Sequence, residues 1–164
     1  MAGGLSPRRI PGAAGPKIVT WQFGRINLQD TDCQSVVSYK ILDPVPVDNV
    51  LAVYRDYCLH KHFQSVIPMI PGRLLAPNTE LFGYYDRGVL AAWSMYRIWD
   101  DKNVLSDHHA WNYRNPRLRL GILSLENECA VYRDRGFLHM YFESVEPYML
   151  DFRGFEILGP MRPD

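Results

Sequence analysis

The 164-residue chain lacks the usual signs of a disulfide-bonded, membrane or secreted protein. Its three cysteines are odd in number and widely spaced, which argues against a disulfide framework. No apolar run approaches the roughly 20 residues that a membrane helix needs. The first 30 residues also contain no apolar stretch typical of a secretory signal. We therefore expect a cytoplasmic protein with no membrane partner.

The chain also has no net charge, because 18 Lys and Arg balance 18 Asp and Glu. This balance argues against a protein that wraps nucleic acid over a wide surface. The charges are nevertheless segregated: residues 1–25 carry a local charge of +4 and residues 126–164 one of −4, whereas residues 110–121 contain arginines and no acid. A local positive patch in a neutral protein favours a small anionic ligand over a long polyanion.

Composition indicates an ordinary globular protein, with 47% hydrophobic and 22% charged residues. A chain of this length can bury a core without a structural metal. Its beginning is rich in Gly, Pro and Ala and has no apolar periodicity. We therefore predict a flexible N-terminal arm over residues 1–30 and one domain over residues 31–164.

Hydrophobic periodicity predicts alternating strands and helices in this domain. Strands are predicted over residues 35–42, 81–85, 89–99, 104–111, 137–142 and 155–158. Helical spacing predicts helices from Val47 and from Gly121, and Pro147 can begin a short third one. The three strands between residues 81 and 111 are joined by tight turns and predict an antiparallel meander. The expected fold is α/β (α+β), a mixed twisted sheet in which the meander is followed by helix, strand, helix and strand.

This order of elements resembles the GNAT superfamily of N-acyltransferases over residues 36–158. Residues 81–99 look like the central hairpin of that fold, and residues 116–123 (PRLRLGIL) occupy the place of its phosphate-binding loop. Residues 150–157 look like the ending of the family, a short helix that runs into Gly-Phe and the last strand. The resemblance implies an enzyme that transfers an acyl group, most simply acetyl, from acyl-CoA to a small-molecule or peptide amine.

The loop at residues 116–123 suits an anion, because a helix N-terminus presents unpaired backbone N–H groups. By resemblance, the coenzyme A diphosphate is held by Arg117, Arg119, Leu120, Gly121 and Ile122. The loop departs from the family pattern at Leu118 and Leu123, where the family has a polar and a small residue.

Attack of an amine on a thioester needs a base and groups that polarise the carbonyl. Asp107 and His109 are candidate bases, because alternation along a strand places them on one face. Glu143 is a third candidate, at the end of the strand predicted over residues 137–142. Tyr148 lies near the general acid of the family, whose position is occupied by Leu150. For each of these residues, a surface or structural role is the alternative.

Two other functions stay open. Residues 113–155 also resemble the C-terminal half of aminoacyl-tRNA–protein transferases, through Asn115-Pro116, Arg119-Leu120-Gly121 and Met140-Tyr141-Phe142. This resemblance implies charged tRNA as the donor. The departures at Leu118, Leu123 and Leu150 favour instead a non-catalytic binding module of the same fold. The oligomeric state is also open, and a homo-oligomer is one alternative.

A metal site is not expected, because neither His108-His109 nor His60-x-His62 converges and no Cys or acid cluster completes a site.

A pantetheine-shaped ligand makes one geometric demand. The strands predicted over residues 104–111 and 137–142 have to splay apart, with a pocket at Gly121. A closed sheet would favour the non-catalytic module.

Overall fold

The structure is a computed structural model that describes residues 8–9, 18–19, 22–62 and 69–160. Its strands are β1 (Arg8–Arg9), β2 (Ile18–Val19), β3 (Gln22–Asn27), β4 (Lys40–Ile41), β5 (Thr79–Asp86), β6 (Val89–Ile98), β7 (Asn103–Trp111), β8 (His139–Phe142) and β9 (Phe155–Pro160). Its α-helices are α1 (Val47–Lys61), α2 (Pro71–Leu74) and α3 (Leu120–Asp134). Two short 3₁₀ helices are η1 (Pro116–Leu118) and η2 (Pro147–Asp151).

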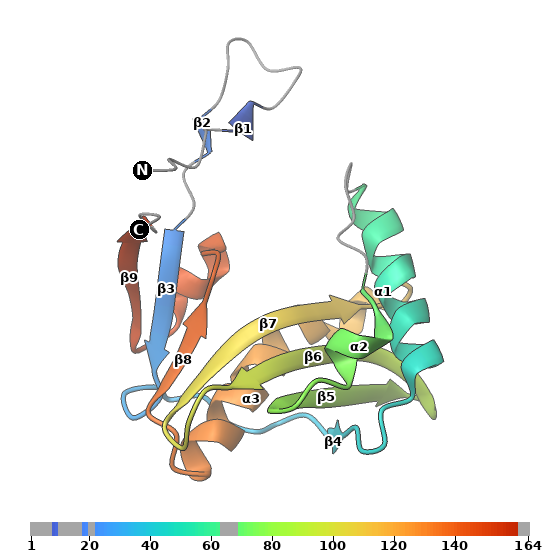
Figure 1. The fold of residues 1–164 in the computed structure, drawn as a ribbon, viewed down its shortest axis with the longest axis horizontal. Coiled ribbons are helices and arrows are strands. Elements are labelled where there is room, and N and C mark those ends of the chain that lie inside the picture. The colour runs from blue at the N-terminus through green and yellow to red at the C-terminus, as the bar shows by residue number, and fades with distance from the viewer. Residues whose placement is uncertain (1–7, 10–17, 20–21, 63–68, 161–164) are drawn as a thin grey trace.

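One mixed sheet organises the molecule, in the order β4-β5-β6-β7-β8-β3-β9 (Figure 1). Its neighbours are antiparallel except β7 and β8, which pair in parallel. The connection between these two strands contains α3, as a parallel pair requires a crossover. The predicted mixed sheet, with a meander followed by helix, strand, helix and strand, is confirmed.

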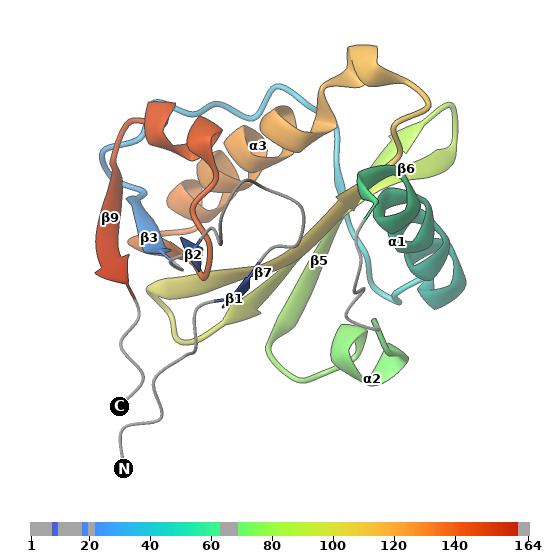
Figure 2. The ribbon, with the colours of Figure 1, turned by 90° about the horizontal axis from the view of Figure 1, so that it is seen from above.

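Helices cover the two faces of the sheet separately (Figure 2). On one face α1 and α2 pack over Trp93, whose indole Nε1 donates to the Val50 carbonyl oxygen at 3.0 Å. On the other face α3 packs over fully buried side chains that include Tyr84, Tyr96 and Met140. The sheet is therefore the middle layer, with helices packed on both of its faces.

The chain before β4 runs along the outer side of α3 (Figure 2). Arg133 of α3 donates from Nη1 to the Cys33 carbonyl oxygen at 2.9 Å, and the Ser35 hydroxyl donates to Asn127 Oδ1. The strand predicted over residues 35–42 is wrong except at residues 40–41, because the beginning of this segment is held against α3 through Ser35 and only its end reaches β5. The extra layer also explains why α3 is buried on several sides.

Residues 22–27, which were predicted to lie in the flexible arm, form β3 instead. This strand lies between β8 and β9 and pairs with both. Its Ile26 is fully buried in the core under α3, which explains why the segment is part of the sheet. The arm residues 1–7, 10–17 and 20–21 lie outside the described residues.

The core under α3 contains one buried carboxyl group, that of Glu128, which is 1% exposed. The Tyr84 hydroxyl donates to its Oε1 at 2.7 Å, and the Tyr96 hydroxyl donates to its Oε2. Burial raises the pKa of Glu128 to about 7, and hydrogen bonds from Ser94, Tyr96 and Tyr84 limit the rise. These bonds join α3 to β5 and β6.

Candidate functional site

The parallel pair of strands diverges halfway along β7. Residues 103–106 of β7 pair with residues 139–142 of β8, and there β8 ends. From Asp107 to Trp111, β7 continues without β8 beside it, and Figure 1 shows β8 running in another direction. We call residues 107–111 the free edge of β7. The splaying that a pantetheine-shaped ligand requires is therefore present.

A β-bulge marks the start of this free edge. Met95 of β6 pairs with His108, whereas the next residue, Tyr96, pairs with Ser106. Asp107 is thus an extra residue without a partner on β6. The bulge breaks the alternation that predicted Asp107 and His109 on one face. Asp107 lies with its neighbour His108 instead, and His108 Nδ1 is 3.0 Å from Asp107 Oδ1.

Two arginines hold the Asp107 carboxylate from different elements. Arg73 of α2 donates to Oδ1 at 3.0 Å, and Arg97 of β6 donates to Oδ2 at 2.8 Å. Burial alone would raise the pKa of Asp107, but the hydrogen bond and charge of His108 and the two guanidinium charges hold it at about 2. A carboxylate of this kind accepts a proton poorly at neutral pH. Both oxygens of Asp107, a predicted candidate base, are thus already bonded to arginines.

His109 lies farther along the free edge, among aromatic rings. Its imidazole stacks on Trp111 with ring centroids 5.1 Å apart and packs edge-on against Tyr57 of α1 at 6.1 Å. Burial, together with the charges of His108 and Lys61, lowers the pKa of His109 to about 4. The ring is therefore neutral at pH 7, and one of its nitrogens can accept a proton.

The start of α3 lies beside the end of this edge. Arg119 caps the helix in the left-handed conformation, with φ of 47°, directly after the 3₁₀ turn of η1. Such a right-handed to left-handed step turns successive backbone N–H groups to one side and forms a site suited to an anion. Ile122 and Leu123 donate to the Arg119 carbonyl oxygen, so these two amides are already used.

A hollow of about 240 Å³ opens at this helix start, and we call it the α3 hollow. Its walls are Trp111, Asn112, Tyr113, Asn115, Pro116, Arg119, Leu120, Gly121 and Ile122. The structure thus brings four of the five predicted coenzyme A residues together around one space. Arg117 is exposed and does not line it.

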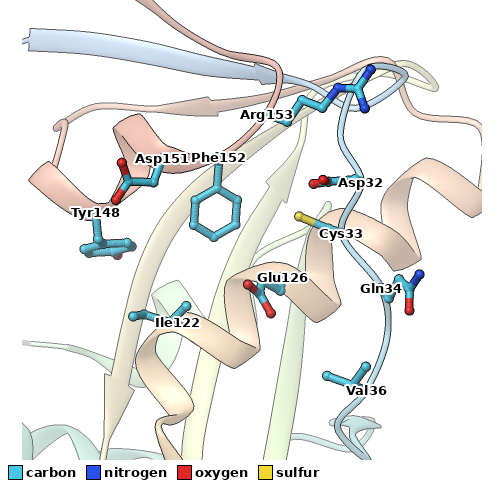
Figure 3. A pocket seen from close by; sticks show the side chains of 10 residues that line it. All are labelled: Asp32, Cys33, Gln34, Val36, Ile122, Glu126, Tyr148, Asp151, Phe152 and Arg153. Carbon is cyan, nitrogen blue, oxygen red and sulfur yellow. The ribbon is translucent and has the colours of Figure 1, made fainter.

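A second hollow, of about 450 Å³, lies between α3, η2 and the segment that crosses α3, and we call it the η2 hollow (Figure 3). Ile122 lines both hollows, so they are adjacent. Tyr148 of η2 lies in its wall, and burial, followed by the charges of Glu146 and Glu128, raises the pKa of Tyr148 to about 12. Its phenol is therefore protonated at neutral pH and can donate a hydrogen bond.

The predicted candidates therefore do not form one cluster, although Asp107 and His109 both belong to the free edge. His109 lies on the free edge, Tyr148 lies in the η2 hollow, and Asp107 is bound to two arginines. Glu143 directly follows the end of β8, as predicted, and its side chain is exposed to solvent. Tyr57 was missed, although its position seven residues after the buried Val50 could have placed it on the inner face of α1.

In the part of the chain that the structure describes, no group of three or more His, Cys, Asp or Glu residues could hold a metal ion. Among the described helices, none combines the length and the apolar character needed to cross a bilayer.

No model of a known protein family matches the chain, and no curated protein matches its sequence. Solved structures share its fold. The C-terminal domain of a putative lysylphosphatidylglycerol synthetase from Agrobacterium fabrum matches with a TM-score of 0.63 and 11% identity, over 76% of this chain and 47% of that chain. The L-PGS structure from Bacillus licheniformis matches over 76% of this chain and 46% of its own, with a TM-score of 0.56 and 7% identity.

A further match is the GCN5-related glucosamine N-acetyltransferase region of a fungal multi-domain β-N-acetylglucosaminidase. It gives a TM-score of 0.61 and 12% identity, over 94% of this chain and 21% of that chain. The chain therefore spans less than half the length of each of these three solved structures. At such identities the likeness concerns the fold alone, and the chain has a GNAT-like fold.

Proposed function

We propose that the protein is an N-acyltransferase that uses acyl-CoA, with acetyl-CoA as the first donor to test, and an amine as the acceptor. One observation carries this proposal. The parallel strands β7 and β8 diverge at Ser106 and Phe142, and the α3 hollow lies beside the free edge that results. An extended pantetheine chain fits along such an edge, with its diphosphate at the helix start. An amine acceptor can then approach from the face that carries α1 and α2.

The donor diphosphate is assigned to the start of α3. The Leu120 and Gly121 amides belong to the first helical turn, where N–H groups have no intrahelical partner. The helix dipole adds positive potential at this end. Arg119 lines the hollow and Arg117 lies two residues earlier, in η1, so both guanidiniums can supply charge-assisted hydrogen bonds. Ile122 would contact the donor where the two hollows meet.

In the proposed reaction the neutral amine nitrogen attacks the thioester carbonyl carbon. The C–N bond forms, the C–S bond breaks, and the sulfur leaves as the coenzyme A thiolate. The amine proton passes to His109, directly or through water, because this imidazole is neutral at pH 7 and has an unprotonated nitrogen; its pKa of about 4 suits it to relay the proton to solvent rather than to hold it. The Tyr148 hydroxyl donates a hydrogen bond to the thiolate as it leaves. Glu143, beyond the end of β8, is the alternative proton acceptor.

Calorimetry with acetyl-CoA and with longer acyl-CoAs tests the donor site. We expect binding, and we expect Arg119→Gln to weaken it about tenfold through the loss of one charge-assisted interaction. Arg55→Gln, an exposed site on α1, is the matched control and should leave it unchanged. Absence of binding by every acyl-CoA at millimolar concentration would contradict the proposal.

A second candidate function is aminoacyl transfer from charged tRNA. This candidate is supported by the similar fold of the putative lysylphosphatidylglycerol synthetase domain. The name of that protein refers to a lysyl group, which is an aminoacyl group. Aminoacyl-tRNA should then bind with a steep dependence on salt, because phosphate contacts release counterions. A non-catalytic module of the same fold is the remaining alternative, and turnover with any acyl donor would contradict it.

A further inference from the structure

We propose that Arg73 and Arg97 form a subsite for an anionic group, a carboxylate or a phosphate, carried by the amine acceptor. This subsite names the class of acceptor, an amine that also carries a negative charge. Its role in acceptor binding rests on the proposed acyl transfer, whereas its affinity for an anion does not.

The two guanidiniums are brought together by a single carboxylate. Arg73 comes from α2 and Arg97 from β6, and each donates one Nη2 hydrogen bond to a different oxygen of Asp107. A guanidinium carries five N–H donors. Within residues 22–62 and 69–160, no other hydrogen bond of either guanidinium is found. Among the described residues, each guanidinium therefore keeps donors that a ligand could use.

Charge and exposure favour an anion at this place. Two positive charges meet one negative charge, so the group of three has a net charge of +1. The Asp107 side chain is only 6% exposed, whereas the side chains of Arg73 and Arg97 are 30% and 48% exposed. The carboxylate thus lies on the inner side of the group and the guanidiniums on the solvent side. Paired guanidiniums in this arrangement suit the planar oxygens of a carboxylate or the oxygens of a phosphate.

The position of this subsite matches a second substrate. Asp107 directly follows Ser106, the last β7 residue that pairs with β8, so the arginines lie where the strands diverge. Arg73 belongs to α2, and α2 and α3 lie on opposite faces of the sheet (Figure 2). A donor held at the start of α3 and an acceptor held by the arginines would therefore meet at the free edge of β7 from opposite sides.

The bulge explains why the carboxylate reaches both arginines. In a regular strand, residue 107 would have a partner on β6, and neighbouring side chains would point to opposite faces. The extra residue rotates Asp107 to the same side as His108, next to α2. The bulge therefore builds the subsite directly after Ser106, the last β7 residue that pairs with β8.

Binding of three small amines to the full chain tests this inference. β-Alanine carries a carboxylate, O-phosphoethanolamine carries a phosphate, and β-alaninamide is the control that keeps the ammonium group but has an uncharged amide in place of the anion. NMR would follow the Nε–H signals of Arg73 and Arg97 during each titration, without any acyl donor. We expect one or both anionic amines to shift these signals, and the comparison of the two identifies the preferred anion. β-Alaninamide should bind at least tenfold more weakly.

Substitution of an arginine and substitution of Asp107 should change the affinity for the anionic amine in opposite directions. Arg97→Gln should weaken binding of the anionic amine about tenfold, through the loss of one charged donor. Asp107→Asn should strengthen it about threefold, because the internal anion that competes for the guanidiniums is gone. Arg87→Gln, in the turn between β5 and β6, is the control for loss of a positive charge and should have no effect. A merely structural ion pair would not give tighter binding in Asp107→Asn.

The results separate this inference from the proposed function. Equal binding of β-alaninamide and both anionic amines, or equal losses in Arg97→Gln and Arg87→Gln, overturns the anion subsite, even if acetyl-CoA binds. If the arginine signals respond to anions but no acyl-CoA binds, the subsite stands and the acyl transfer is wrong. If acyl-CoA is also turned over, KM for the anionic acceptor should rise in Arg97→Gln with little change in kcat.

Discussion

A Cβ atom added to Gly121 would lie 3.2 Å from Cη2 and Cζ2 of Trp111. The first turn of α3 and the last residue of β7 are therefore in direct contact, and only glycine fits there without displacing the indole. Trp111 also stacks on His109 at 5.1 Å. Gly121 was predicted to let a diphosphate approach the backbone, and the structure adds a second reason for a glycine, the packing of the ring that forms a wall of the α3 hollow.

Gly121→Ala is expected to weaken acetyl-CoA binding about fivefold, because the Trp111 ring has to move by a few tenths of an ångström to admit the methyl group. Gly72→Ala is the matched control, since Gly72 also lies in the first turn of a helix and has nothing within 4 Å of its Cβ position. Calorimetry on both variants makes the comparison. Equal affinities in the two variants would show that the position of the indole does not matter for the donor.

His109→Gln is expected to lower kcat about a hundredfold if His109 accepts the amine proton. His139→Gln, another half-buried histidine, on β8, should leave kcat within a factor of two. The imidazole signals of His109 should also show a neutral ring down to about pH 5, because the pKa is lowered to about 4. A kcat that is the same in both variants would transfer the role of the base to Glu143 or to water.

Some features of this fold were readable from the sequence and others were not. The meander and α3 follow from local periodicity, and the observed bounds of β6 and β7 differ from the predicted ones by one residue at one end each. The place of β3 could not be predicted from local periodicity. Its six residues include Gly24, and they pair only with β8 and β9, which lie more than 100 residues later in the chain. The bulge at Asp107 was equally hidden, since alternation in a sequence assumes regular pairing. Because of this one extra residue, Asp107 lies on the same side of β7 as His108 and not with His109.

The buried Glu128 carboxyl should make stability depend on pH. Its pKa is about 7 in the folded chain and about 4.3 in an unfolded one. Between these values the unfolded chain loses its proton first, so the free energy of unfolding should fall as pH rises from about 4.5 to about 7, by about 3 kcal/mol. Glu128→Gln should remove this slope, because an amide does not titrate.

Urea unfolding at several pH values measures how the free energy of unfolding depends on pH, and therefore the contribution of Glu128. Glu126→Gln is the control on the same helix, since Glu126 is half-buried and lines the η2 hollow. That variant should keep the slope of the parent chain. A slope that persists in Glu128→Gln would assign the pH dependence to another group.

Gly24→Val tests whether β3 belongs to the folded unit. A Cβ at Gly24 would lie 2.7 Å from Cζ of Phe155 and 3.1 Å from Cγ2 of Val145, so the two further methyl groups of valine would overpack this part of the core. We expect a loss of about 2 kcal/mol in the free energy of unfolding, measured with urea. Gln22→Val, at an exposed position of the same strand, controls for strand propensity and should change stability by less than about 0.5 kcal/mol. A small effect in both variants would mean that residues 22–27 behave as the flexible arm that the composition of the chain predicts.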